Sequence, residues 1–162
     1  MMEESKTEGF RKSPSHFDGR YSPSGPTILF ITVCTQDREE VLAIEDVHQT
    51  ILNAWKAADA WLVGRYVLML DHIHFFVSPA SFDSADLKKW MAYWRSHATR
   101  NWPRPEEYPI WQRDYWDRAL RRGQSYSEKW EYVRENPVRA GLVSDPDDWP
   151  FQGELNELIW HD

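Results

Sequence analysis

Residues 64–79 read GRYVLMLDHIHFFVSP and contain two runs, 65–69 and 72–78, that are rich in β-branched and aromatic residues. Runs of this composition are typical of strands. Leu70 and Asp71 stand between the two runs, and a connection of two residues turns the chain back on itself. The stretch therefore predicts a β-hairpin.

The second run of this hairpin carries two histidines on one face. His72 and His74 are two positions apart, and side chains alternate along a strand, so both point the same way. The apolar residues of the run point to the other face: Ile73, Phe75 and Val77. The pair is either a metal clip on a rigid strand or two ordinary hydrogen-bonded histidines, and on its own it does not decide between these interpretations.

The remaining pattern predicts a small α+β fold. A first strand is expected at 27–35, where β-branched and aromatic residues follow Gly-Pro, and a weaker last strand at 110–120. Apolar residues recur at helical spacing in three segments, which are 44–61, 84–102 with Ser84 as its N-cap, and 125–136 before Pro137. This order suits a ferredoxin-like antiparallel sheet with helices on one face, plus a C-terminal helix carrying a tyrosine.

The length and composition predict one domain. The chain has 162 residues, of which 41% are hydrophobic, enough for one core. We expect a flexible lead-in at 1–26, the domain at 27–143 and an acidic tail at 144–162. The single cysteine excludes a disulfide framework or a cysteine zinc site, and no apolar signal segment is seen, so a cytoplasmic, nucleoid-associated protein is expected.

The charge is unevenly distributed. The formal net charge of -7 speaks against a nucleic-acid partner. However, residues 88–140 hold twelve Lys and Arg against seven Asp and Glu, between two acidic segments. This basic segment is either a surface for phosphates or ordinary variation. The acidic tail either folds over it and competes with DNA, or serves only solubility.

A second constellation lies in WEYVRENPVRAGLV, residues 130–143. Tyr132 and Asn136 are four residues apart on the predicted helix and therefore face the same way. Two imidazoles and an amide oxygen would leave coordination positions open on a divalent cation, where a phosphate could bind near the Tyr132 hydroxyl. The alternative is that Tyr132 packs in the core and Asn136 only ends the helix.

Several motifs together resemble one family. MLDHIHFFV resembles the histidine strand of the REP-associated tyrosine transposases, which are single-tyrosine HUH enzymes. WQRDYWDRALRR, EYVRENPVRAGLV and DDWPF resemble the C-terminal half of that family in order and spacing. One departure is that Leu70 and Asp71 stand where the family commonly has Pro-Asn, which leaves open a different turn or an Asp71 side chain near the metal.

The resemblance implies a function and a site. His72 and His74 match the metal-binding pair, Tyr132 matches the nucleophilic tyrosine, and Asn136 falls where a third ligand is expected. The implied cofactor is a divalent metal, Mg²⁺ or Mn²⁺. The implied enzyme is a transposase-type endonuclease that cuts and rejoins single-stranded DNA hairpins of repetitive palindromic elements through a 5′-phosphotyrosine, acting as a monomer rather than a dimer.

The DNA contacts are expected within the basic segment. The candidates are Arg113, Arg118, Arg121, Arg122 and Arg139, with Lys88, Lys89 and Arg95 as a second set. Trp111, Tyr115 or Trp116 would stack on unpaired bases or pack in the core. The competing nucleophiles are Tyr93, Tyr108, Tyr115 and Tyr126. An alternative function is a catalytically retired nucleic-acid-binding or regulatory protein on the same fold; a metal-dependent phosphoesterase is a third.

Overall fold

The computed structural model describes residues 27–84, 86–121 and 124–159, so the expected lead-in at 1–26 lies outside the described residues. In the described part, five strands form one antiparallel sheet in the order β4-β1-β3-β2-β5. The strands are β1 (Leu29–Cys34), β2 (Trp61–Leu68), β3 (His72–Pro79), β4 (Trp116–Ala119) and β5 (Gln152–Glu154). The first four follow the ferredoxin-like order, which confirms the predicted α+β fold.

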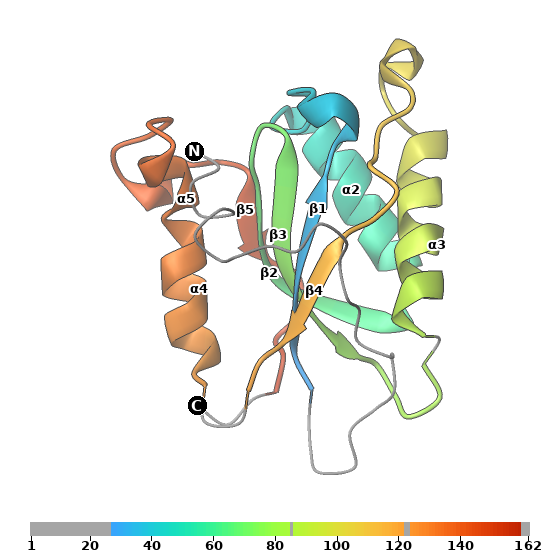
Figure 1. Ribbon diagram of the computed structural model, residues 1–162, viewed down its shortest axis with the longest axis vertical. Coiled ribbons are helices and arrows are strands. Elements are labelled where there is room, and N and C mark those ends of the chain that lie inside the picture. Colours follow the sequence, from blue (N-terminus) through green and yellow to red (C-terminus); the bar gives the residue numbers. More distant parts are fainter. Residues whose placement is uncertain (1–26, 85, 122–123, 160–162) are drawn as a thin grey trace.

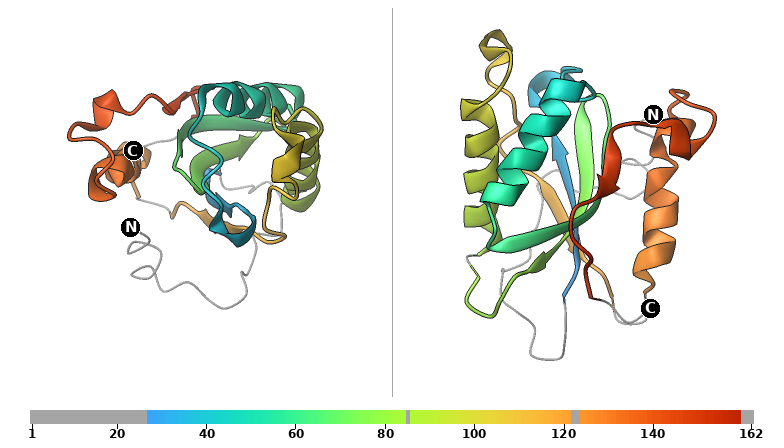
Figure 2. Two further views of the ribbon diagram at one scale, coloured as in Figure 1. Left: turned by 90° about the horizontal axis from the view of Figure 1, so that it is seen from above. Right: turned by 180° about the vertical axis from the view of Figure 1, so that it is seen from behind.

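Helices cover both faces of the sheet (Figures 1 and 2). α2 and α3 lie on one face, and α4 lies on the other. The helices and short 3-10 turns are α2 (Glu45–Ala57), α3 (Leu87–Arg100), α4 (Tyr126–Arg134), α5 (Asn136–Arg139), η1 (Gln36–Arg38), η2 (Pro105–Glu107) and η3 (Pro146–Asp148). Among the described helices, none has the length and apolar character needed to cross a membrane.

The central strand β3 is buried on both faces. Ile73, Phe75 and Val77 enter the core under α2 and α3, which also takes in most of the buried tryptophans. Phe76 enters the smaller core under α4. His72 and His74 share the parity of Phe76 and therefore lie on the α4 side. The predicted alternation along the histidine strand is thus confirmed.

Two element boundaries differ from the sequence expectation. α2 ends at Ala57 rather than at 61, because Trp61 opens β2 and packs against Trp90 with ring centroids 6.4 Å apart. α3 is capped by Asp86, whose carboxylate accepts a hydrogen bond of 2.8 Å from the Lys89 N–H. Ser84 was expected as this cap, but its hydroxyl donates to the Ala60 carbonyl instead.

The C-terminal third also departs from expectation. The last predicted strand forms only at β4, because residues 110–115 run as a loop held to β1 by a bridge between Thr35 and Trp111. The helix expected to stop before Pro137 ends at Arg134, and Pro137 lies in the first turn of the separate helix α5, where a missing N–H costs nothing. The acidic segment contributes η3 and β5, and Trp149 from this segment is buried and donates to the Leu68 carbonyl.

β2 approaches α4 closely at Gly64. A Cβ added there would lie 2.6 Å from the Tyr126 hydroxyl oxygen and 2.7 Å from two side-chain carbons of Leu158. The Tyr126 hydroxyl in turn accepts a hydrogen bond of 3.0 Å from the Arg65 N–H. Gly64 therefore lets the first turn of α4 lie against the sheet on the histidine side.

Replacing Gly64 by Ala should lower the free energy of unfolding by about 1–3 kcal/mol, because the added methyl group overpacks a filled space. The midpoint of urea unfolding measures this effect. In a chain that already carries Leu158→Ala, the same change should cost less, since part of the clash has been removed. A Gly64→Ala chain with the wild-type midpoint would contradict the close approach of α4.

Candidate functional site

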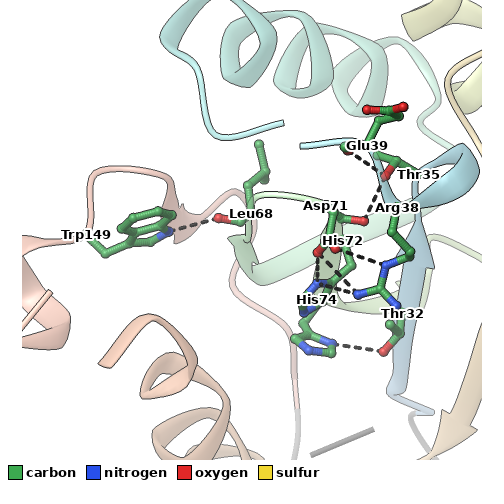
Figure 3. Close-up of polar contacts among 9 residues, drawn as sticks. All are labelled: Thr32, Thr35, Arg38, Glu39, Leu68, Asp71, His72, His74 and Trp149. Atoms are coloured by element: carbon green, nitrogen blue, oxygen red, sulfur yellow. Dashed lines mark hydrogen bonds and ion pairs between the residues drawn. The ribbon is translucent and has the colours of Figure 1, made fainter. Parts of the chain in front are cut away.

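The two histidines lie against each other on β3, and each Nδ1 atom has a polar neighbour (Figure 3). Their rings are T-shaped with centroids 4.8 Å apart, and both residues are buried. His74 Nδ1 lies 2.9 Å from the Thr32 hydroxyl, and His72 Nδ1 lies 2.8 Å from Asp71 Oδ1. Because both Nδ1 atoms are engaged, Nε2 is the atom that each ring would offer to a ligand.

His72 is a neutral imidazole at neutral pH. Burial lowers the pKa of His72 to about 4, and the hydrogen bond with Asp71 opposes this only in part. Burial alone would raise the pKa of Asp71, but hydrogen bonds with His72 and Arg38 hold it below its ordinary value. The contact between these two residues is therefore a hydrogen bond from neutral imidazole to carboxylate, and neutral imidazole is the form that binds metals.

Tyr132 lies on α4, the helix that covers the histidine face. Its side chain is 47% exposed. Lys129 links it to the histidines, because the Lys129 Nζ lies 5.9 Å from the Tyr132 ring centroid and 4.9 Å from that of Phe30. Phe30 stacks on His74 with centroids 5.3 Å apart. The structure thus brings the tyrosine helix and the histidine pair to one side of the sheet.

Asn136 follows one turn after Tyr132 and is buried. Its Oδ1 accepts a hydrogen bond of 3.0 Å from Arg139, whose guanidinium also lies 4.2 Å from the Tyr132 ring centroid. Its Nδ2 is buried and has no hydrogen-bond partner among the described residues. Buried amides are normally satisfied, so this N–H donor is open to a hydrogen-bond acceptor, whereas a metal would have to bind Oδ1.

The other tyrosines considered as nucleophiles are placed differently. Tyr115 and Tyr126 are buried, and burial raises the pKa of each to about 12. Tyr93 is exposed, but it lies on α3, across the sheet from the histidines. Tyr108 donates to the Thr99 carbonyl at the end of α3. Tyr132 therefore combines exposure with placement on the histidine face.

The predicted DNA contacts divide between the two faces. Arg118 lies opposite Phe30 in the β4–β1 register, so both side chains project from the same face of the sheet as the histidines. Arg113, before β4 in the chain, and Arg121, after it, are both exposed. The structure does not bring the second set to the histidines, because Lys88, Lys89 and Arg95 lie on α3 behind the sheet. Arg122 lies outside the described residues.

One of the three aromatic candidates faces the histidines. Trp116 is opposite Thr32 in the β4–β1 register, so its side chain projects from the histidine face, where it is half-buried. Tyr115 belongs to the core under α2 and α3, and Trp111 packs against that core. The Arg95 guanidinium lies 5.5 Å from the Tyr115 ring centroid and donates to the Gln112 carbonyl. Arg95 therefore supports the loop before β4.

The two histidines are of a residue type that binds divalent metals, but they are only two protein ligands. The described residues contain no group of three or more His, Cys, Asp or Glu side chains suited to a metal. His72 and His74 supply two neutral imidazoles, so a third protein ligand has to be of another type. The Asn136 amide oxygen has a second lone pair beside the one that Arg139 occupies. These three residues stay a predicted ligand set.

A histidine pair on a buried central strand, facing a helix with an exposed tyrosine, is the arrangement that the HUH resemblance predicts. No protein-family model matches the chain. A REP-associated tyrosine transposase from Haemophilus influenzae is 25% identical over 139 residues, covering 76% of this chain and 77% of the relative. That of Escherichia coli K12 is 25% identical over 139 residues, covering 82% and 78%.

A solved structure shares the fold. It is that of a REP-associated tyrosine transposase bound to a REP hairpin, with a TM-score of 0.66 and 20% identity over 88% of this chain and 81% of that chain. The resemblance indicated by the motifs is therefore confirmed: in sequence and in fold, this chain is related to the REP-associated tyrosine transposases.

Some residues of the site could not be found from the sequence. No pattern in the sequence relates Lys129 to Phe30, because the two residues meet only after α4 packs on the sheet. Arg38 approaches Asp71 from η1, 33 positions earlier in the chain. Asp71 itself had a signal, since it directly precedes His72 and departs from the family pattern.

The buried tyrosines should titrate late. Burial raises the pKa of Tyr66, Tyr115 and Tyr126 to about 12. Replacing any one of them by Phe should therefore leave the rise in tyrosinate absorbance unchanged up to about pH 11, where phenols of ordinary pKa have largely ionised. A single Tyr→Phe change among these three that removed part of the absorbance rise below about pH 11 would contradict the described burial.

Proposed function

We propose that this protein is a single-stranded DNA transesterase that cleaves and rejoins hairpin DNA through a 5′-phosphotyrosine on Tyr132. The observation that carries the proposal is the exposed Tyr132 on the face of the buried histidine pair. The names of the relatives and the hairpin bound in the related structure support the same assignment. Both parts come from one chain, which supports action as a monomer.

The chemistry needs a metal site and a nucleophile. A divalent cation, Mg²⁺ or Mn²⁺, would be held by His72, His74 and Asn136 and would neutralise charge on the scissile phosphate. The Tyr132 oxygen attacks the phosphorus in line with the departing 3′-oxygen. The new bond joins phosphorus to the phenolic oxygen, the bond to the 3′-oxygen breaks, and the phenol proton ends on the 3′-hydroxyl.

Rejoining is the reverse of cleavage. A 3′-hydroxyl from the same or another strand attacks the phosphotyrosine and restores the free phenol, so no ATP is needed. Lys129 and Arg139 lie over the Tyr132 ring and would contribute positive charge near the reacting phenol in both directions. Arg118 and Trp116 on the same face would contact a phosphate and stack on a base.

A covalent adduct is the direct test. The chain is incubated with Mn²⁺ and a hairpin oligonucleotide from the host's own repeats flanking this gene, and the products are separated by denaturing electrophoresis. A 3′ label should move with the protein, whereas a 5′ label should appear on a shortened free strand, because the tyrosine retains the 5′-phosphate. Tyr132→Phe should abolish the adduct, since it removes the attacking oxygen.

Tyr93→Phe is the matched control, because Tyr93 is 53% exposed on the opposite face. It should form the adduct at the wild-type level. Hairpin binding without any adduct in the wild type would favour the retired binding protein. Cleavage that persists in Tyr132→Phe without an adduct would favour a hydrolase that uses water.

The histidine face should also govern DNA affinity. Lys129→Ala should weaken hairpin binding and reduce the slope of log affinity against log salt by about 1, because one phosphate contact is lost. Lys88→Ala on α3 is the control and should change neither quantity. Fluorescence anisotropy with a labelled hairpin at several salt concentrations measures both. The opposite pattern would place the DNA on the α3 side.

A further inference from the structure

A carboxylate stands directly behind His72. Asp71 Oδ1 lies 2.8 Å from His72 Nδ1, and the Asp71 side chain is 18% exposed. The Arg38 guanidinium holds the same carboxylate with two contacts, Nε to Oδ2 at 3.1 Å and Nη2 to Oδ1 at 3.2 Å (Figure 3). The described groups thus form a row from Arg38 through Asp71 to His72, with a longer direct contact of 3.4 Å between Arg38 Nη2 and His72 Nδ1.

This row determines which nitrogen of His72 carries the proton. A carboxylate can only accept hydrogen bonds, so His72 Nδ1 is the donor in the 2.8 Å contact with Asp71, which is shorter than the 3.4 Å contact of Nδ1 with Arg38 Nη2. The lone pair of the neutral ring then lies on Nε2. The Thr32 hydroxyl beside His74 both donates and accepts, so it imposes no such choice on the second ring.

The fold holds Asp71 in place from two directions. Its carbonyl accepts hydrogen bonds from the Thr35 N–H at 3.0 Å and the Thr35 hydroxyl at 3.1 Å. Arg38 comes from η1, where Asp37 and Arg38 both have φ of 55°. Such left-handed backbone is unfavourable for a non-glycine residue. The chain therefore tolerates strain in the turn that carries the Arg38 side chain to Asp71.

We propose that Asp71, held by Arg38, is a positioning residue that keeps His72 in the Nδ1–H form so that Nε2 is ready to bind the divalent metal. The inference rests on the proposed function, because it needs a metal at the histidine pair. A carboxylate behind a metal-binding histidine fixes ring orientation and raises ligand basicity, and loss of such a partner typically costs 10–100-fold in affinity.

Metal affinity of the full chain is measured with Mn²⁺ alone, by electron paramagnetic resonance of free Mn²⁺. Asp71→Ala should bind Mn²⁺ about 10–100-fold more weakly than the wild type. Asp71→Asn retains an acceptor oxygen and should recover part of that loss. Asp46→Ala is the control, since it also removes a carboxylate paired with an arginine, Arg104, and should leave the affinity unchanged.

Arg38→Gly separates positioning from stability. Glycine adopts positive φ without strain, which offsets part of the stability lost with the Arg38–Asp71 ion pair, so the midpoint of unfolding should change little. Its Mn²⁺ affinity should nevertheless fall several-fold, because Asp71 loses its clamp. If Mn²⁺ affinity falls only in the variants whose unfolding midpoint also falls, across Arg38→Gly and both Asp71 variants, the positioning role is overturned.

The tautomer itself provides a readout that needs no metal. In the metal-free wild type, ¹⁵N shifts of His72 should indicate a protonated Nδ1 and a bare Nε2, and Asp71→Ala should lose this preference. A wild type with protonated Nε2, or equal Mn²⁺ affinity in Asp71→Ala, would overturn this inference alone. A wild type that binds no Mn²⁺ would overturn the metal site and this inference with it, whereas loss of the DNA adduct with normal Mn²⁺ binding would overturn only the proposed reaction.

Discussion

The double burial of β3 is the constraint on which the rest of the molecule depends. A central strand with helices over both faces must bury whatever it carries, so the two histidines are removed from water together with Phe76. Buried imidazoles require partners. Thr32 on the neighbouring strand and Asp71 at the hairpin turn supply polar neighbours. Burial also keeps His72 neutral, which links the folding of the sheet to the proposed metal site.

The same constraint explains why the tyrosine helix lies where it does. Tyr126, Trp130 and Val133 of α4 cover the face of the sheet that α2 and α3 do not cover. Gly64 gives this helix room to approach. Once these apolar residues are buried, the opposite side of α4 must be exposed. Tyr132 is an exposed residue of this helix, and the Lys129 Nζ lies 5.9 Å from its ring centroid and 4.9 Å from that of Phe30. Packing and chemistry therefore share one short helix.

The acidic composition is compatible with DNA chemistry because charge is sorted in space. Lys129, Arg139 and Arg118 lie on the histidine face, around Tyr132 and Phe30. Two acids of the C-terminal segment form ion pairs, Asp147 with Arg134 at the end of α4 and Glu154 with Arg65 on β2. These two arginines are outside the predicted DNA contacts. A net charge summed over the chain therefore says little about the potential at one site, since screening limits surface charges to a range of about 10 Å.

Local pattern was enough to predict the hairpin, the three long helices and the shared face of His72 and His74, because strand alternation and helical spacing are properties of neighbouring residues. It also indicated the resemblance to the REP-associated tyrosine transposases, two of which are 25% identical to this chain. It failed at Ser84 and Trp61, where a cap and a tryptophan contact were decided across the fold. Only the tertiary structure decided three features: the contact of Lys129 with Phe30, the pairing of β5 with β2, and the ion pair of Arg38 with Asp71. Each joins residues that are distant in the sequence and meet only when the sheet forms and the helices pack on it.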